Sequence, residues 1–200
     1  MFYGAIGIGY KSKLIMCSNG VTAIEYQDII KKSGMFETLD QSYGEGKYTF
    51  MQDGAPAHNA GCTKMFLKKR CSFIARWPAN SPDLNHIEHL WGAIKRILKT
   101  KEINSKTELI HYVNEIWESF PQEAIDRLVS SFRARLYAVI NQNGQSITDI
   151  LRSGIYHMIS TVIPYRADLL TLTKIIEAYD PNVDDNFAIF VHLFLYSCTF

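Results

Sequence analysis

Two acidic residues, Asp53 and Glu88, constrain the fold of this 200-residue chain more than any other feature of its sequence. Asp53 directly follows residues 48–52, a β-prone run, so the sequence predicts that it stands at the carboxyl end of a strand. Glu88 lies in a stretch whose apolar residues recur at helical spacing. An acidic strand end followed by an acidic helix favours an α/β fold, because α/β sheets present polar groups at the carboxyl ends of their strands.

Turn and capping signals predict the other elements of this fold. Residues 2–8 and 13–17 are apolar runs around a glycine-containing turn, which is typical of a β-hairpin, and 71–77 read as a further strand. Helices are predicted over residues 22–32, 59–69, 81–99, 106–119 and 122–141. The predicted N-caps are Thr22 for the first helix, Ser81, followed by Pro82 as first residue, for the third, and Ser105 or Asn104 for the fourth. The sequence therefore predicts a mixed sheet with flanking helices.

Composition is that of a folded chain without a dominant charge. Hydrophobic residues make up 47% and charged residues 20%, which suits one globular domain with a sizeable core. The formal net charge of +1 gives no general support for nucleic-acid binding, so a basic surface must come from local clusters. Two clusters are candidates for phosphate contact: Lys64, Lys68, Lys69, Arg70 and Arg76, and Lys95, Arg96, Lys99 and Lys101.

Cysteine spacing and hydropathy favour an intracellular protein. The four cysteines form no C-x-x-C pair and no tight framework, which argues against a zinc ribbon or a disulfide scaffold. Residues 1–9 are apolar but lack a basic leader, so we read them as a buried strand and not as a signal peptide. The apolar run 187–200 is shorter than the roughly 20 residues of a membrane-spanning helix, so we expect no membrane partner.

Two motifs carry a resemblance to a known family. They read QDGAPAH over residues 52–58 and SPDLNHIEHLWG over residues 81–92, with 34 residues between Asp53 and Glu88. The motifs and their spacing resemble the catalytic core of the mariner superfamily of cut-and-paste DNA transposases, which use a DDE or DDD carboxylate triad. The resemblance covers about residues 2–147 and is weaker outside the two motifs. His86 stands where the family motif usually has proline.

The resemblance implies an RNase H-like core and DNA as the substrate. In this family two divalent ions, usually Mg²⁺ and sometimes Mn²⁺, are held by three carboxylates and promote phosphodiester hydrolysis and strand transfer. Asp53 and Glu88 match the second and third carboxylates, which implies catalytic and metal-binding roles for both. His58 and Asn85 are implied as supporting residues. Transposition and DNA integration further imply a nuclear location, and no small-molecule cofactor is expected.

The first carboxylate of the triad has no counterpart here. Residues 1–18 contain no Asp or Glu, and the family's first strand should precede Phe2. We therefore expect an incomplete two-ion site and no DNA cleavage by this chain, with residues 1–150 as a partial RNase H-like transposase domain missing its first strand and 151–200 as an unassigned tail. An exposed sheet edge would favour association into homo-oligomers. We expect non-specific DNA binding, because no helix-turn-helix region precedes residue 1.

Several roles stay open from the sequence alone. His58 suits either a group that orients phosphate or a site carboxylate, or a cap of the helix that follows. His86 and His89 flank Glu88 at zinc-like spacing, but no further Cys or His completes such a site, so solvated helix histidines are favoured. The alternative function is a non-catalytic nucleic-acid-binding or protein-interaction domain that has kept the RNase H-like fold.

Overall fold

Six short strands form one mixed sheet in the computed structural model of the chain, which describes residues 1–73, 77–78, 81–142 and 188–194. They are β1 (Phe2–Gly7), β2 (Tyr10–Lys11), β3 (Ile15–Met16), β4 (Thr49–Gln52), β5 (Ser72–Phe73) and β6 (Ala188–Phe194). The order across the sheet is β2-β1-β6-β4-β5, and β3 pairs with β1. The predicted α/β class with a mixed sheet is thereby confirmed.

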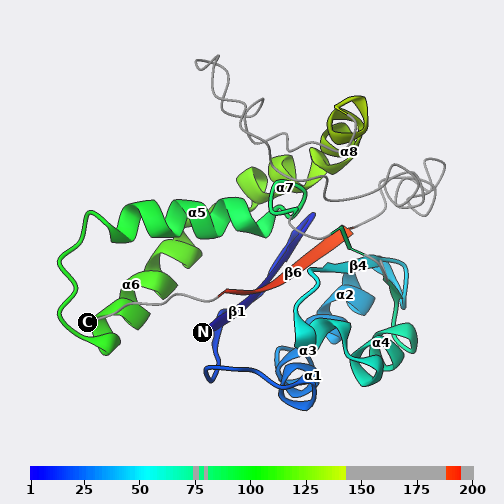
Figure 1. The fold of residues 1–200 in the computed structure, drawn as a ribbon, viewed down its shortest axis with the longest axis horizontal. Coiled ribbons are helices and arrows are strands. Elements are labelled where there is room, and N and C mark those ends of the chain that lie inside the picture. Colours follow the sequence, from blue (N-terminus) through cyan, green and yellow to red (C-terminus); the bar gives the residue numbers. More distant parts are fainter. Residues whose placement is uncertain (74–76, 79–80, 143–187, 195–200) are drawn as a thin grey trace.

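The strand β6 comes from the far end of the chain and lies between β1 and β4 (Figure 1). It runs antiparallel to β1 and parallel to β4. Val191 pairs with Ala5 on one side and with Gln52 on the other. The two halves of the sheet are therefore joined through β6, which falls within the predicted tail; the rest of residues 151–200 lie outside the described residues.

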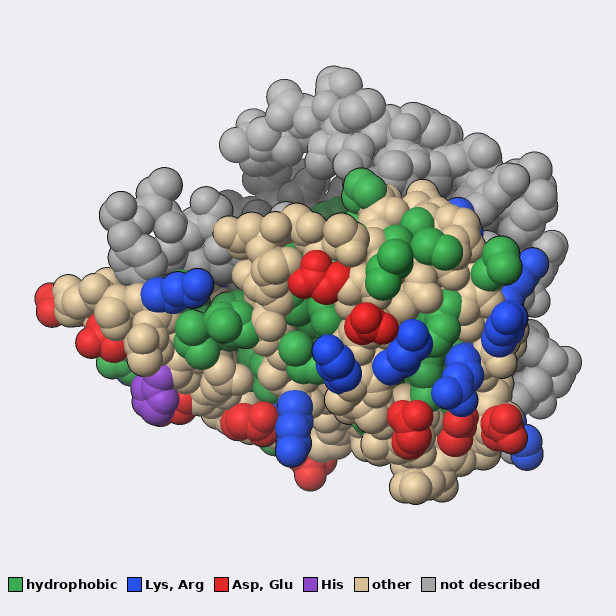
Figure 2. Space-filling model, turned by 90° about the horizontal axis from the view of Figure 1, so that it is seen from below, with side chains coloured by type: hydrophobic (Ala, Val, Ile, Leu, Met, Phe, Trp, Pro, Cys, Tyr) green, Lys and Arg blue, Asp and Glu red, His purple; other side chains and the backbone are tan. Residues whose placement is uncertain are grey.

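Helices cover both faces of this sheet (Figure 1). One face carries α1 (Ala23–Lys32), α2 (Met35–Tyr43), α3 (Pro56–Asn59) and α4 (Gly61–Lys68), and the other carries α5 (Ile87–Leu98), α6 (Lys106–Ser119), α7 (Gln122–Ser130) and α8 (Phe132–Asn141). On the surface shown in Figure 2, Lys and Arg side chains are interspersed with Asp and Glu side chains. That surface is therefore mixed in charge.

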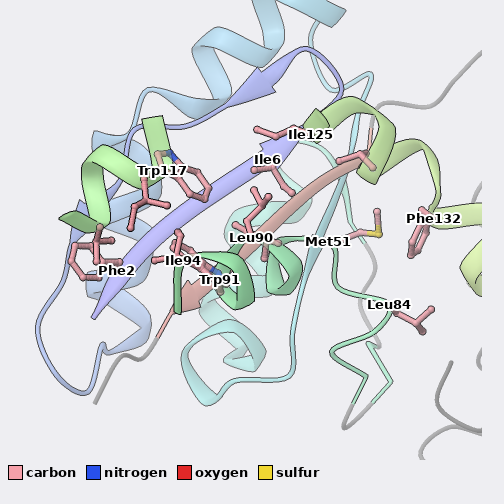
Figure 3. Packing of buried hydrophobic residues seen from close by; sticks show 14 of the residues in the cluster. Phe2, Ile6, Met51, Leu84, Leu90, Trp91, Ile94, Trp117, Ile125 and Phe132 are labelled. Carbon is pink, nitrogen blue, oxygen red and sulfur yellow. The ribbon is translucent and has the colours of Figure 1, made fainter. Parts of the chain in front are cut away.

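Each face has its own apolar core. Beneath α5 and α6, the indole rings of Trp91 and Trp117 are both fully buried and stack with centroids 5.2 Å apart (Figure 3). The opposite core gathers aromatic side chains, among them Tyr3, Tyr26 and Phe50. The motif residue Trp91 is therefore part of the core.

Local signals fixed several boundaries correctly. The Thr22 hydroxyl accepts a hydrogen bond from the Glu25 backbone N–H and caps α1. The Ser105 hydroxyl does the same for Glu108 at the start of α6. The predicted strand before Asp53 is β4, and the predicted hairpin appears as β1 with β2 and β3 both antiparallel to it.

The helix predicted from Ser81 begins instead at Ile87. The backbone carbonyl of Asp83, which a continuous helix would offer to the Ile87 N–H, accepts a hydrogen bond from the Arg135 guanidinium at 2.9 Å. Asp83 is 4% exposed and lies before α5, although a helix starting at Pro82 would include it in its first turn. Residues 81–84 form a separate hydrogen-bonded turn, in which the Leu84 N–H donates to the Ser81 carbonyl, and the contact with α8 holds this turn ahead of α5.

One further predicted helix is divided at a serine, and another begins two residues later than predicted. The helix over 122–141 is divided into α7 and α8 at Ser131, whose hydroxyl donates to the Leu128 carbonyl. The helix over 59–69 starts later, as α4, because Ala60 is extended and the Thr63 hydroxyl takes the Ala57 carbonyl. The helix α2 was not predicted. Of the strand predicted over 71–77, residues 72–73 form β5, and 74–76 lie outside the described residues.

Candidate active site

Asp53 is the first residue after β4, and contacts within the following loop fix its carboxylate. Its Oδ1 accepts a hydrogen bond from the Ala55 backbone N–H at 3.0 Å, a turn geometry that Asp favours. The Nδ1 of His58 lies 2.5 Å from the same oxygen. The Asp53 side chain is 30% exposed, whereas that of His58 is fully buried. Asp53 is therefore an oriented carboxylate at the boundary between core and solvent.

His58 lies in the short helix α3 and faces Asp53. It does not cap the helix that follows, because the N-cap of α4 is Ala60 and makes no side-chain hydrogen bond. The sequence left open whether His58 orients phosphate or a site carboxylate or caps the following helix. In the structure its imidazole contacts the Asp53 carboxylate.

Glu88 lies in the first turn of α5, where the positive end of the helix dipole favours a carboxylate. Its neighbours Ile87 and Leu90 are buried, whereas Glu88 itself is half-buried. Its backbone N–H donates to the carbonyl of Asn85, which is 4% exposed. Glu88 therefore lies at the margin of the apolar side of α5, and Asn85 belongs to the buried turn that leads into the helix.

The elements that carry Asp53 and Glu88 meet in one apolar cluster. Met51, two residues before Asp53, and Ile87, directly before Glu88, both belong to the core beneath α5 (Figure 3). The helix α5 also contacts β6, the neighbour of β4. Among the residues that the structure describes, no three His, Cys, Asp or Glu side chains form a group that could hold a metal ion.

Arg135 of α8 ties the Glu88 motif to the end of the helical region. Its guanidinium donates to the Asp83 carbonyl at 2.9 Å, to the Ser131 hydroxyl at 2.9 Å and to Nε2 of His89 at 2.7 Å. The Nε2 of His86 lies 3.2 Å from the same hydroxyl. Since Arg135 can only donate, His89 must accept at Nε2. This network holds the turn before α5, and with it the start of the helix that carries Glu88.

Two parts of this network differ from the prediction. His86 is fully buried and is not a solvated helix residue. Arg135 lies outside the two motifs, where the resemblance is weaker, yet it is only 8% exposed. A signal was present in the sequence, because Arg135 lies at helical spacing with Phe132 and Val139, both buried. A charged residue on the apolar side of a helix generally needs buried partners.

The sequence of this region matches a defined family. Residues 17–110, which include both Asp53 and Glu88, match the family described as DDE superfamily endonuclease. This segment belongs to the DDE superfamily of endonucleases. The match begins just after β3 and ends within α6, so it contains β4, α5 and the turn between them. The resemblance to a DDE transposase catalytic domain, inferred from the two motifs, is confirmed.

Similar proteins of this superfamily are transposases of nematodes. The transposable element Tc3 transposase of Caenorhabditis elegans is 29% identical over 149 residues, 74% of this chain and 45% of the relative. The Tc1 transposase of the same organism is 33% identical over 104 residues, 52% of this chain and 38% of the relative. The Tcb1 transposase of Caenorhabditis briggsae is 32% identical over 119 residues, 60% and 43% of the two chains. The chain thus spans less than half the length of these relatives.

The two basic clusters of the DDE segment lie on different faces of the sheet. Lys64 and Lys68 belong to α4, and Lys69 and Arg70 follow it, whereas Lys95, Arg96 and Lys99 lie in the last turn of α5 and just beyond. The helices α4 and α5 pack on opposite cores, so the structure does not join the clusters into one surface. Arg76 lies outside the described residues. In the described part of the chain, no helix has the length and apolarity needed to cross a membrane.

The histidines of this network predict a loss of stability in mild acid. Burial, together with the positive Arg135, lowers the pKa of His89 from 6.5 to about 4, and burial lowers that of His86 in the same direction. Between these values the unfolded chain binds protons that the folded chain does not, so the free energy of unfolding falls as the pH falls from about 6.5 to about 4. Arg96 adds to this effect on His89, and Asp83 opposes it.

Urea unfolding of the metal-free protein at several pH values in this range measures the effect. We expect His89→Gln to flatten the dependence on pH, because it removes one of the two titrating groups. His111→Gln is the matched control, since the His111 side chain is 75% exposed. Equal slopes for the two variants would contradict the prediction.

Proposed function

We propose that this chain carries a transposase-type domain for metal-dependent cleavage and joining of DNA strands, with Asp53 and Glu88 as two of its catalytic carboxylates. One observation carries the proposal: the two motif carboxylates adjoin residues of a single core cluster, within a segment of the DDE superfamily. We also propose that the mixed sheet and its flanking helices are an RNase H-like core. The β6 pairing extends the proposed domain of residues 1–150 by one strand from the tail.

The donor atoms of the site suit a hard divalent cation. DDE endonucleases depend on divalent metal, and Mg²⁺ and Mn²⁺ prefer carboxylate oxygens to imidazole or thiolate. Asp53 and Glu88 would hold the ion, with His58 supporting Asp53 through the contact at 2.5 Å and Asn85 supporting the turn before Glu88. When bound, such ions activate an attacking water or 3′-hydroxyl and stabilise the leaving oxygen.

We further propose that metal binding is weak and that this chain alone does not cleave DNA. The observation in support is that, within the described ranges, no three His, Cys, Asp or Glu side chains form a group that could hold a metal ion. A single carboxylate facing one positive charge at about 4 Å contributes about 4 kcal/mol at an effective dielectric of 20, and about twice that for a divalent ion. The loss of one ligand from three is therefore large for a site that must hold two ions.

Titration with Mn²⁺, followed by calorimetry, tests the metal site. We expect Asp53→Asn and Glu88→Gln each to weaken binding by about tenfold or more, because each removes a charged ligand. Glu115→Gln is a matched control, since the Glu115 side chain is 63% exposed on α6. Unchanged affinity in both site variants would overturn the assignment. Mg²⁺-dependent cutting of DNA by the wild-type chain, lost in Asp53→Ala, would overturn the proposed inactivity.

DNA is the proposed partner, bound without sequence preference in the nucleus. The exposed basic side chains on α4 and at the end of α5 supply phosphate contacts, although they lie on different faces. A second candidate is a non-catalytic nucleic-acid-binding or protein-interaction domain, which the two-carboxylate site also supports. Mn²⁺-induced NMR shifts centred on Asp53 and Glu88 favour the first function, and DNA binding without such shifts favours the second.

A further inference from the structure

A chain of buried polar groups lies behind Asp53, on the side of the sheet covered by α1. Tyr26 of α1 and His58 of α3 are fully buried, and Gln52, the last residue of β4, is 6% exposed. Buried polar groups cost free energy unless they are hydrogen-bonded, so a series of them needs a structural or functional reason. This series of hydrogen-bonded groups ends at the Asp53 carboxylate.

The first two contacts fix the orientation of the Gln52 amide. The Tyr26 hydroxyl donates to Gln52 Oε1 at 2.9 Å. The Gln52 Nε2 donates to the backbone carbonyl of His58 at 3.0 Å. With the amide turned over, its oxygen would face that carbonyl, and two acceptors cannot share a hydrogen bond. The His58 carbonyl therefore fixes the orientation of the amide, and the Tyr26 hydroxyl, by donating to Oε1, holds the amide in place against the His58 backbone.

Tyr26 also holds the His58 side chain. The two rings have centroids 4.3 Å apart and planes inclined by 36°. The imidazole Nδ1 lies 2.5 Å from Asp53 Oδ1, and because an ionised carboxylate oxygen can only accept, Nδ1 carries the proton. The other ring nitrogen, Nε2, is buried and has no hydrogen-bond partner among the residues that the structure describes. The imidazole is thus held at its backbone, at its ring face and at Nδ1.

We propose that Tyr26 and Gln52 are positioning residues, which fix the His58 imidazole and through it the orientation of the Asp53 carboxylate toward a divalent cation. The part of the inference that concerns the cation rests on the proposed function. The part that concerns the orientation of the Asp53 carboxylate rests on the contacts alone. Neighbouring buried tyrosines make no such link: the hydroxyl of Tyr48 donates to Asp40, and that of Tyr3 contacts the sulfur of Met35. The hydroxyl of Tyr26 differs from these two because its hydrogen bonds lead through Gln52 and His58 to Asp53.

The first experiment uses the metal-free full chain and reads the His58 Nδ1 proton by NMR. In wild type, this proton should be observed as a slowly exchanging signal. Tyr26→Phe removes only the hydroxyl, and we expect exchange to become about fivefold to tenfold faster, as for the loss of one hydrogen bond. Gln52→Met should act in the same direction. Tyr48→Phe is the matched control, since Tyr48 is 2% exposed in the same core and its hydroxyl bonds elsewhere.

Backbone NMR spectra that match the wild type outside α1 and residues 52–58 establish that the variants are folded. An exchange rate in Tyr26→Phe equal to that of wild type, or an equal acceleration in Tyr48→Phe, would overturn the inference. If Tyr26→Phe or Gln52→Met fails to fold, the exchange rate in the other variant tests the inference, because each substitution removes a different hydrogen-bonding group between α1 and His58.

The second experiment measures Mn²⁺ affinity in the same variants. We expect Tyr26→Phe to weaken binding by about tenfold, the lower end of the range for residues that orient metal ligands, while Tyr48→Phe leaves it unchanged. Wild-type affinity in Tyr26→Phe would overturn the link to the cation. If the wild-type chain binds no Mn²⁺, the proposed function fails, and the exchange rates still decide whether Tyr26 and Gln52 position Asp53.

Discussion

Val191→Pro is expected to lower the free energy of unfolding of the chain by about 3 kcal/mol or more. Val191 lies at the middle of β6, paired with Ala5 of β1 and Gln52 of β4, so β6 is hydrogen-bonded on both edges. Proline removes a backbone donor and fixes φ, and it is therefore excluded from central strands. A cost of about 3 kcal/mol or more is a large part of the roughly 5–15 kcal/mol that holds a domain folded.

Urea unfolding followed by tryptophan fluorescence and circular dichroism measures this effect. Val191→Ala is the control, because it changes the side chain and keeps the backbone donor. A chain that ends at residue 186, before β6, should behave like the proline variant. If the proline variant unfolds at the same urea concentration as Val191→Ala, then β6 does not join the two halves of the sheet.

Replacing Trp117 with alanine is expected to lower the free energy of unfolding by about 3–5 kcal/mol. The Trp117 side chain is fully buried, stacks on Trp91 of α5, and donates from Nε1 to the Ser12 carbonyl at 2.8 Å. It also packs over Gly4 of β1, where an added Cβ would lie 3.1 Å from the indole. Trp117 therefore links α6, α5 and the sheet, and its removal leaves a large cavity.

Trp117→Phe separates the contributions of the ring and the hydrogen bond. It keeps an aromatic side chain against Trp91 and leaves the buried Ser12 carbonyl without its donor, so we expect a smaller loss, of about 1–3 kcal/mol. Chemical denaturation of both variants at one pH gives the comparison. Equal losses for Ala and Phe would show that packing against Trp91 contributes little.

Predictions from the sequence were right where a few neighbouring residues decide the outcome. Thr22 and Ser105 accept hydrogen bonds three residues ahead, so their helices start where the capping pattern places them. The strand before Asp53 could be read from its β-prone residues and from the turn that the Asp side chain makes with Ala55. The two motifs, read together with their spacing, also identified the DDE superfamily.

Predictions failed where a partner far along the chain competes with a local preference. Pro82 and Asp83 are residues that favour the first turn of a helix, yet α5 begins only at Ile87. The Asp83 carbonyl accepts a hydrogen bond from Arg135, which is 52 residues away in the sequence. His86 reads as a surface residue of a polar motif, but it is buried beside Ser131, with its ring against Phe132. Helical spacing with Phe132 and Val139 indicates that Arg135 is buried, but no sequence period identifies Asp83 as its partner.

The sequence by itself determined the superfamily, the two carboxylates and the elements that carry them. These depend on residue identity and on preferences that act within one or two helical turns. Only the tertiary structure decided that β6 joins β1 to β4, that Arg135 holds the turn before Glu88, and that Tyr26 lies behind Asp53. Strand pairing and the burial of polar groups are stable only when every partner is present, and here the partners are far apart in the sequence.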